Sequence, residues 1–149
     1  TGIILFINNT PIRWISKCQK TIETSTYGSE LVAARIAIDL IIEMIHSLKS
    51  LGVPIDGPAL LLGDNQSVVL NTTVPSSVLK KKHNAVAFHH IREAIAAGIC
   101  RFVHIRSEEN YADLLTKSSG KKDFNFLSRE LLFQLLAATC PPDRLQPLI

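Results

Sequence analysis

The sequence predicts an α/β fold, and three of its segments lead to that class. Residues 59–62 are a short apolar run between a proline and a glycine, which is typical of a buried strand. Residues 30–49 are largely apolar with a single polar stripe, which is typical of a long helix packed on a core. Residues 2–7 and 12–18 are β-rich and flank the turn-forming sequence Asn-Asn-Thr-Pro, which predicts a β-hairpin.

The composition limits the class of protein. Of the 149 residues, 46% are hydrophobic and 19% are charged, which is typical of a globular domain and not of a disordered segment. Cys18, Cys100 and Cys140 suggest neither a disulfide framework nor a Cys-x-x-Cys metal site, and they favour a reducing compartment. The apolar region 31–48 contains ionisable side chains that a membrane-spanning helix would rarely accept. The net charge of +3 is too small to indicate nucleic-acid binding by itself.

The helix predicted over residues 30–49 has one narrow polar stripe. Its members recur every three or four residues and are Arg35, Asp39, Glu43 and His46. At about 100° per residue, Glu30 falls roughly opposite that stripe, so we expect it to point toward the core. A core-facing carboxylate is costly unless it is paired or bound to a metal ion. The structural alternative is that Glu30 compensates the helix dipole, since a capping box would need Ser or Thr where Tyr27 stands.

Asp64 directly follows the strand predicted over residues 59–62. Open α/β sheets present ligand-binding groups at this place, beyond the carboxyl end of a strand. The structural alternative is a simple strand-to-helix turn, in which Asp64 or Ser67 caps a helical segment that begins at Val68. Taken alone, the capping interpretation is the commoner one.

A helix with a basic first turn is predicted over residues 80–98, ended by Gly98. The basic turn consists of Lys80, Lys81, Lys82 and His83. Such a run is most often a solvated face, and its sharper interpretation is a patch that contacts phosphates. For His83, His89 and His90 we expect a surface role, because no Cys or carboxylate completes a metal-ligand spacing around them.

A last strand is predicted over residues 100–106, and a helical turn follows it. Asp113 lies in that turn and is a third acid placed beyond a strand. Residues 124–138 have a helical pattern, and the proline-rich residues 139–149 are expected to be a loose tail. We therefore expect one domain over residues 1–138.

Glu30, Asp64 and Asp113 come from three different segments. Carboxylates that converge suit a pair of Mg²⁺ ions, which prefer hard oxygen ligands and clamp the attacking and leaving oxygens of a phosphodiester. The spacing in the sequence leaves open whether these three side chains meet.

Several sequence blocks, in order, resemble the ribonuclease H domain at the end of a copia-type LTR-retrotransposon Pol polyprotein. The blocks are Trp-Ile-Ser-Lys-Cys-Gln at 14–19, Thr-Ser-Thr-Tyr-Gly-Ser-Glu at 24–30, Gly-Asp-Asn-Gln-Ser at 63–67, Lys-His to Arg-Glu at 82–93, and Arg-Ser-Glu to Ala-Asp-Leu-Leu-Thr-Lys at 106–117. They resemble the family patterns W-x-S-K-x-Q, LSSTEAE, EDNQS, KHIDI-x-YHF-x-RE and LADIFTK. The resemblance covers residues 1–117.

The resemblance implies a ribonuclease H-like fold, a mixed sheet flanked by helices, that hydrolyses the RNA strand of RNA–DNA hybrids. It makes Glu30, Asp64 and Asp113 the catalytic ligands of two Mg²⁺ ions, for which Mn²⁺ can substitute. It assigns hybrid contacts to the basic turn at 80–83 and to Asn65, Gln66 and Ser67. It also implies a reverse transcriptase domain of the same polyprotein as partner, no membrane, and a cytoplasmic location in virus-like particles or a nuclear one.

The chain departs from the family pattern in ways that carry expectations of their own. The family has a fourth acid on a central strand that precedes the hairpin, and that strand is missing here. We therefore expect a fragment of a longer polyprotein that is impaired in catalysis and marginally stable. Asn84-Ala85 replaces Ile-Asp of the pattern, and Gly28 replaces a non-catalytic Glu.

A second interpretation is a non-catalytic ribonuclease H-like module, decayed or truncated, that binds hybrid or tethers to the polymerase. An integrase-like nuclease of the same fold fits less well, because the hairpin and the blocks at 63–67 and 112–117 do not match its pattern.

Overall fold

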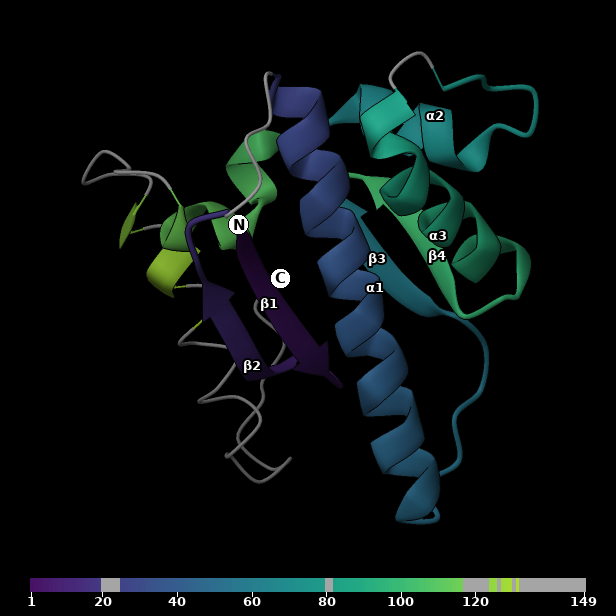
Figure 1. Ribbon diagram of the computed structural model, residues 1–149. Helices are drawn as coiled ribbons and strands as arrows, with labels where there is room; N and C mark the ends of the chain where they lie inside the picture. Colours follow the sequence, from purple (N-terminus) through teal and green to yellow (C-terminus); the bar gives the residue numbers. More distant parts are fainter. Residues whose placement is uncertain (20–24, 80–81, 117–123, 126, 130, 132–149) are drawn as a thin grey trace, which may run out of the picture. The chain divides into compact units, whose positions relative to one another are not determined.

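The computed structural model of the chain describes residues 1–19, 25–79, 82–116, 124–125, 127–129 and 131. The chain forms two compact units (Figure 1). The first comprises Thr1 and Cys18–Asn110, and the second comprises Gly2–Lys17 and the chain from Tyr111 onward. Strands and helices are both present, which confirms the predicted α/β class at that coarse level. The predicted tail at 139–149 and most of the helix predicted at 124–138 lie outside the described residues.

The first unit is built on two parallel strands. β3 (Ala59–Gly63) pairs with β4 (Cys100–His104), so that Leu61 lies opposite Phe102 and Gly63 lies opposite His104. Parallel strands need a long connection, and here it contains two helices. These are α2 (Gln66–Thr73) and α3 (Ala85–Ala96), with the short 3₁₀ turn η1 (Lys82–Asn84) before α3.

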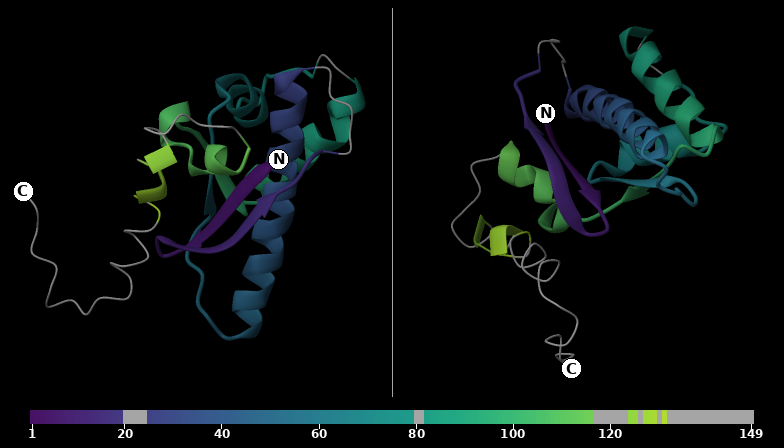
Figure 2. Two further views of the ribbon diagram at one scale, coloured as in Figure 1. Left: turned by 90° about the vertical axis from the view of Figure 1, so that its left-hand side faces the viewer. Right: turned by 90° about the horizontal axis from the view of Figure 1, so that it is seen from below.

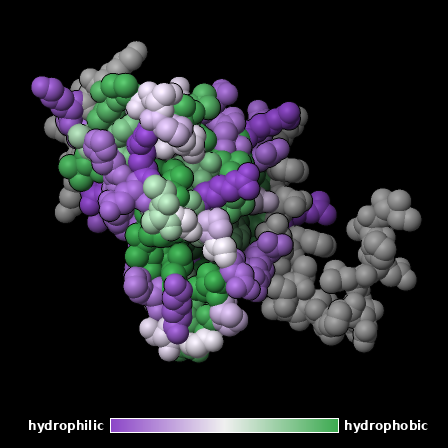
Figure 3. Space-filling model, turned by 90° about the vertical axis from the view of Figure 1, so that its right-hand side faces the viewer, coloured by the Kyte–Doolittle hydropathy of each residue, from purple (hydrophilic) through white to green (hydrophobic). Residues whose placement is uncertain are grey.

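Three helices pack on this strand pair. α1 (Thr26–Ser50) contacts β3, α2 and α3, while α2 and α3 contact β4 (Figures 1 and 2). The centre of the core is fully buried and consists of Leu31, Ile38, Val68 and Ile91. Apolar side chains also reach the surface between hydrophilic ones on the face drawn in Figure 3.

The strand pair is covered on one face only within the described part of the first unit. Leu61 and Phe102 are buried, whereas Leu60 is 60% exposed and Leu62 is 48% exposed. Successive side chains of a strand point to opposite faces, so an apolar run over one covered face exposes every second residue. The prediction of a buried strand is therefore wrong for Leu60 and Leu62.

Helix α1 is longer than the predicted residues 30–49. It begins at Thr26 because the Ser25 side chain accepts a hydrogen bond from the backbone N–H of Gly28 at 3.3 Å. All four members of its polar stripe are exposed, as the sequence predicted. The stripe therefore marks the solvent side of α1.

The helix predicted over residues 80–98 begins later than expected. Its first described turn is the 3₁₀ turn η1, and the α-helix α3 begins only at Ala85. At the other end Gly98 adopts φ +68°, a conformation that L-residues rarely adopt. Its N–H donates a hydrogen bond to the Ile95 carbonyl at 3.0 Å. The predicted glycine cap is confirmed.

The second unit contains the predicted hairpin. β1 (Gly2–Ile7) and β2 (Thr10–Ser16) are antiparallel and joined by Asn8 and Asn9, at φ 46° and 65°. Positive φ at both residues is the geometry of the two-residue turns that suit twisted hairpins.

The hairpin packs against η3 (Tyr111–Leu115), a 3₁₀ turn from the far end of the chain. Ser16 Oγ donates to the Leu115 carbonyl at 2.7 Å, and the rings of Phe6 and Tyr111 are 6.1 Å apart. The residues that form η3, Asp113 among them, are thereby attached to the hairpin.

Among the described residues, no helix combines the length and the apolar character needed to cross a membrane.

Candidate active site at the end of strand β3

Asp64 is half-buried and is the first residue after β3. The following residue, Asn65, is the N-cap of α2, and its Oδ1 accepts a hydrogen bond from the Val68 N–H at 3.3 Å. The prediction that Asp64 or Ser67 caps a helix beginning at Val68 is therefore wrong. Helix α2 begins two residues earlier than expected, at Gln66, which moves the cap to Asn65. Capping does not account for Asp64.

The backbone around Asp64 is held by the neighbouring strand. The Gly63 carbonyl accepts from the Ile105 N–H at 3.0 Å, and the Asp64 carbonyl lies 3.1 Å from His104 Nε2. A Cβ atom added to Gly63 would lie 2.9 Å from the Phe102 ring, so glycine leaves the space that this ring occupies. These contacts fix the direction in which the chain leaves β3.

Glu30 is the fifth residue of α1 and is exposed. The prediction that it points into the core is wrong, although Leu31 and Ala34 on the same helix are buried. A helical wheel gives the direction of a side chain but not how much protein lies over it, and little lies over a residue close to the start of a helix.

Glu30 and Asp64 nevertheless share one end of the first unit. Helix α1 begins at the end where β3 finishes (Figure 1), and α1 contacts both β3 and α2. Tyr27 Oη accepts a hydrogen bond from Asn71 Nδ2 at 3.4 Å, which links the first turn of α1 to α2. Two carboxylates therefore belong to the same end of one compact unit.

Asp113 belongs to the second unit. It is half-buried on η3, where its carbonyl accepts from the Thr116 N–H at 3.1 Å. Glu30 and Asp64 belong to the first unit and Asp113 to the second, so the convergence of all three acids stays a prediction. Within either unit, the residues that the structure describes contain no group of three or more His, Cys, Asp or Glu side chains able to hold a metal ion.

The donor set at the end of β3 fits magnesium in its chemistry. Glu30 and Asp64 supply hard carboxylate oxygens, which Mg²⁺ prefers. Mg²⁺ keeps several waters in most protein sites and takes only one or two protein carboxylates, the rest of its shell coming from substrate phosphates. Two carboxylates in one unit therefore agree with an ion shared between protein and phosphate.

Of the predicted nucleic-acid contacts, several are exposed. Lys82, His83, Gln66 and Ser67 are exposed, whereas Lys80 and Lys81 lie outside the described residues. Asn65 is half-buried and its side-chain oxygen is used by the helix cap. Gln66 and Ser67 are therefore better placed than Asn65 to contact a ligand.

The histidines of α3 differ in their surroundings. His89 is exposed, and His90 Nε2 lies 2.9 Å from Asp39 Oδ1 on α1. The expected surface role holds for His89, whereas His90 connects two helices.

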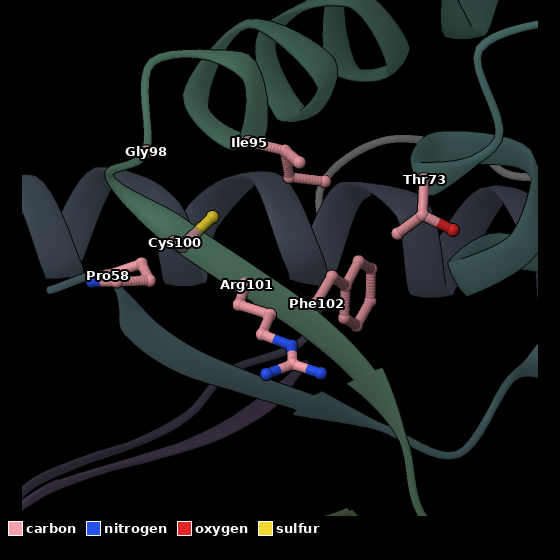
Figure 4. Close-up of a pocket in the computed structure, with 7 residues that line it drawn as sticks. All are labelled: Pro58, Thr73, Ile95, Gly98, Cys100, Arg101 and Phe102. Carbon is pink, nitrogen blue, oxygen red and sulfur yellow. The ribbon is translucent and has the colours of Figure 1, made fainter.

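An open hollow of about 420 Å³ lies near the other ends of β3 and β4 (Figure 4). Its lining includes Pro58, Ile95, Cys100 and Phe102. Pro58 and Cys100 lie at the starts of the two strands, whereas Asp64 follows the end of β3. The hollow contains none of the predicted site residues and is not part of the candidate site.

Three curated proteins similar to this chain come from plant transposons. The retrovirus-related Pol polyprotein from transposon RE2 of Arabidopsis thaliana is 28% identical over 130 residues, which is 87% of this chain and 9% of the relative. That from transposon RE1 of the same plant is 29% identical over 86% of this chain and 9% of the relative. That from transposon TNT 1-94 of Nicotiana tabacum is 30% identical over 89% of this chain and 10% of the relative.

The chain is similar to a segment of retrovirus-related Pol polyproteins. It spans about a tenth of the length of these Pol relatives. No family model matches the chain, and no solved structure matches it. The similarity covers most of this chain and therefore includes the greater part of the first unit.

The sequence did not predict that His104 contacts the candidate site. Strand alternation placed it on the same face as Cys100 and Phe102, but its partner depends on the register between β3 and β4. The local sequences of two strands that lie far apart in the chain do not determine this register.

Proposed function

We propose that this chain is the ribonuclease H part of a retrotransposon Pol polyprotein and hydrolyses the RNA strand of RNA–DNA hybrids. The observation that carries the proposal is the setting of Asp64, a half-buried acid directly after a parallel strand, with its backbone held by β4. Acids at this place in an α/β unit face the ligand. The similarity to transposon Pol polyproteins supports a role in copying the element.

In this proposal Glu30, Asp64 and Asp113 hold two Mg²⁺ ions, for which Mn²⁺ can substitute. When bound, the ions neutralise charge on the scissile phosphate and lower the pKa of water. The task of the chain is to fix the carboxylates: Asp64 through the contacts of Gly63 with β4, and Glu30 through its place near the start of α1.

The hybrid is held through its backbone. Lys82 and His83 are exposed in η1, and together with Lys80 and Lys81 they supply positive charge for phosphates. Phosphate contacts position a duplex without reading its sequence, which suits an enzyme that must accept any hybrid.

The test is cleavage of a labelled RNA strand annealed to DNA, with Mg²⁺ and then Mn²⁺, using chain purified from a host that lacks its own ribonuclease H. We expect Asp64→Asn to lower the rate by at least about a hundredfold, because loss of a group that merely supports a metal ligand already costs about 10–100-fold. Asp56→Asn is the matched control, since Asp56 is an exposed acid in the loop before β3. Equal rates for the two variants would contradict the proposal.

One observation favours the second candidate function, a non-catalytic module that binds hybrid or tethers to the polymerase. Asn84 is only 2% exposed, and its side-chain amide has no hydrogen-bond partner among the described residues. A buried unpaired amide destabilises a fold, as expected in a decaying domain. Hybrid binding without cleavage in either metal would favour this candidate.

A further inference from the structure

His104 contacts the backbone of Asp64 from the neighbouring strand. It is the last residue of β4 and lies opposite Gly63, the last residue of β3. Its Nε2 is 3.1 Å from the Asp64 carbonyl oxygen. A carbonyl oxygen only accepts hydrogen bonds, so the contact requires the proton on Nε2 and makes the imidazole the donor.

This hydrogen bond is the central one of three contacts on consecutive residues. On one side the Gly63 carbonyl accepts from the Ile105 N–H at 3.0 Å. On the other side Asn65 Oδ1 accepts from the Val68 N–H at 3.3 Å. The His104 bond fixes the peptide plane between Asp64 and Asn65, and so the ψ angle of Asp64.

The consequence concerns the carboxylate. With its backbone fixed, the Asp64 side chain moves only through its own two torsions. A metal ligand that is fixed before the ion arrives loses less conformational freedom on binding than a mobile one.

We propose that His104 is a positioning residue for Asp64, which it orients as a metal ligand by donating Nε2–H to the Asp64 carbonyl. This inference rests on the metal-binding role proposed for Asp64. His104 acts through the backbone and is not itself a ligand of the ion.

The first measurement is the tautomer of His104. Nitrogen-15 NMR of the histidine side chains in the full chain, assigned with His104→Gln, should show the proton of His104 on Nε2. A neutral ring with its proton on Nδ1 would overturn the proposal, whether or not the chain cleaves hybrid.

The second measurement is the affinity for Mn²⁺, followed by the EPR signal of the free ion. We expect His104→Leu to weaken binding by about tenfold, the lower limit for losing a group that supports a metal ligand. His104→Gln should bind within about threefold of the parent chain, because the glutamine amide offers an N–H donor at a similar reach. His46→Leu, which replaces an exposed histidine of α1, is the control.

The outcomes separate the two proposals. Unchanged affinity in His104→Leu, with binding lost in Asp64→Asn, would overturn the positioning role and keep the site. Equal weakening in the Leu and Gln variants would mean that the imidazole itself is needed, and would overturn it too. Binding unaffected by Asp64→Asn would overturn the proposed metal site itself.

Discussion

Asn84 shows how one residue limits the stability of the first unit. It is 2% exposed, and in the part of the chain that the structure describes neither its Nδ2 nor its Oδ1 has a hydrogen-bond partner. Burying a polar group without a partner costs about 1–3 kcal/mol. The copia-type pattern has isoleucine at this place, which would carry no such cost.

We therefore expect Asn84→Ile to raise the free energy of unfolding by about 1–2 kcal/mol. The measurement is urea unfolding followed by circular dichroism. Asn71→Leu is the matched control with the opposite sign, because the Asn71 amide donates to Tyr27 and accepts from Ser77. A loss of stability in Asn84→Ile would mean that the amide has a partner after all.

Burial raises the pKa of the Cys100 thiol by penalising the thiolate. The reactive species is the thiolate, so Cys100 should be alkylated by iodoacetamide far more slowly than the exposed Cys18. Peptide mass spectrometry of a time course at pH 8 measures both rates. Similar rates would show that the core around Cys100 opens readily.

The same shift has a consequence for stability. The folded state holds the Cys100 proton more tightly than the unfolded state does. The stability that this bound proton contributes to the folded state is therefore fully present below the ordinary thiol pKa, and it is lost as the pH rises through the pKa of the folded state. Cys100→Ala should remove this part of the alkaline loss of stability.

At the scale of elements, Arg92 of α3 holds the end of α2. Its guanidinium donates to the carbonyls of Asn71, Val74 and Pro75, at 3.4, 3.0 and 2.8 Å, and lies over the Phe88 ring. Lysine cannot reproduce this planar fork. We expect Arg92→Lys to cost about 1–2 kcal/mol in urea unfolding, whereas Arg101→Lys on the exposed face of β4 should cost little.

Substitutions in the turn of the hairpin test whether the hairpin contributes to the thermal stability of the protein. Asn9 has φ 65°, which costs an ordinary L-residue about 1–2 kcal/mol. Asn9→Val should lower the midpoint of thermal unfolding, and Asn9→Gly should keep or raise it. Two equal midpoints would show that the hairpin does not contribute to the measured transition.

The hydrophobic periodicity of the sequence predicted most of the helices and strands. The hairpin, the long helix with its polar stripe and both parallel strands follow from local sequence alone. The exposure of Leu60 and Glu30 could not be predicted, because it depends on how much protein covers a face or a helix end. The His104 contact with Asp64 depends on register, and the cap at Asn65 depends on a helix start that shifted by two residues.

At the scale of the whole molecule, exposed apolar side chains predict self-association. Trp14 is 67% exposed in the second unit, and Leu60 is 60% exposed in the first. Exposed apolar side chains on one face of a strand, such as Leu60 and Leu62 of β3, favour contact between molecules. Sedimentation should show a mass that rises with concentration, and Leu60→Thr with Leu62→Thr should reduce that rise. A constant monomer mass in the parent chain would contradict this.

The pairing of the hairpin with η3 determines when the hairpin can find its partner during synthesis. Ser16 and Leu115, which share a hydrogen bond, are 99 residues apart in the chain. The hairpin leaves the ribosome before the first unit, whereas η3 emerges only after every described strand and helix of that unit. The first unit can therefore fold before the hairpin has its partner, and the apolar side chains of β1 and β2 stay open to chaperones until η3 has emerged.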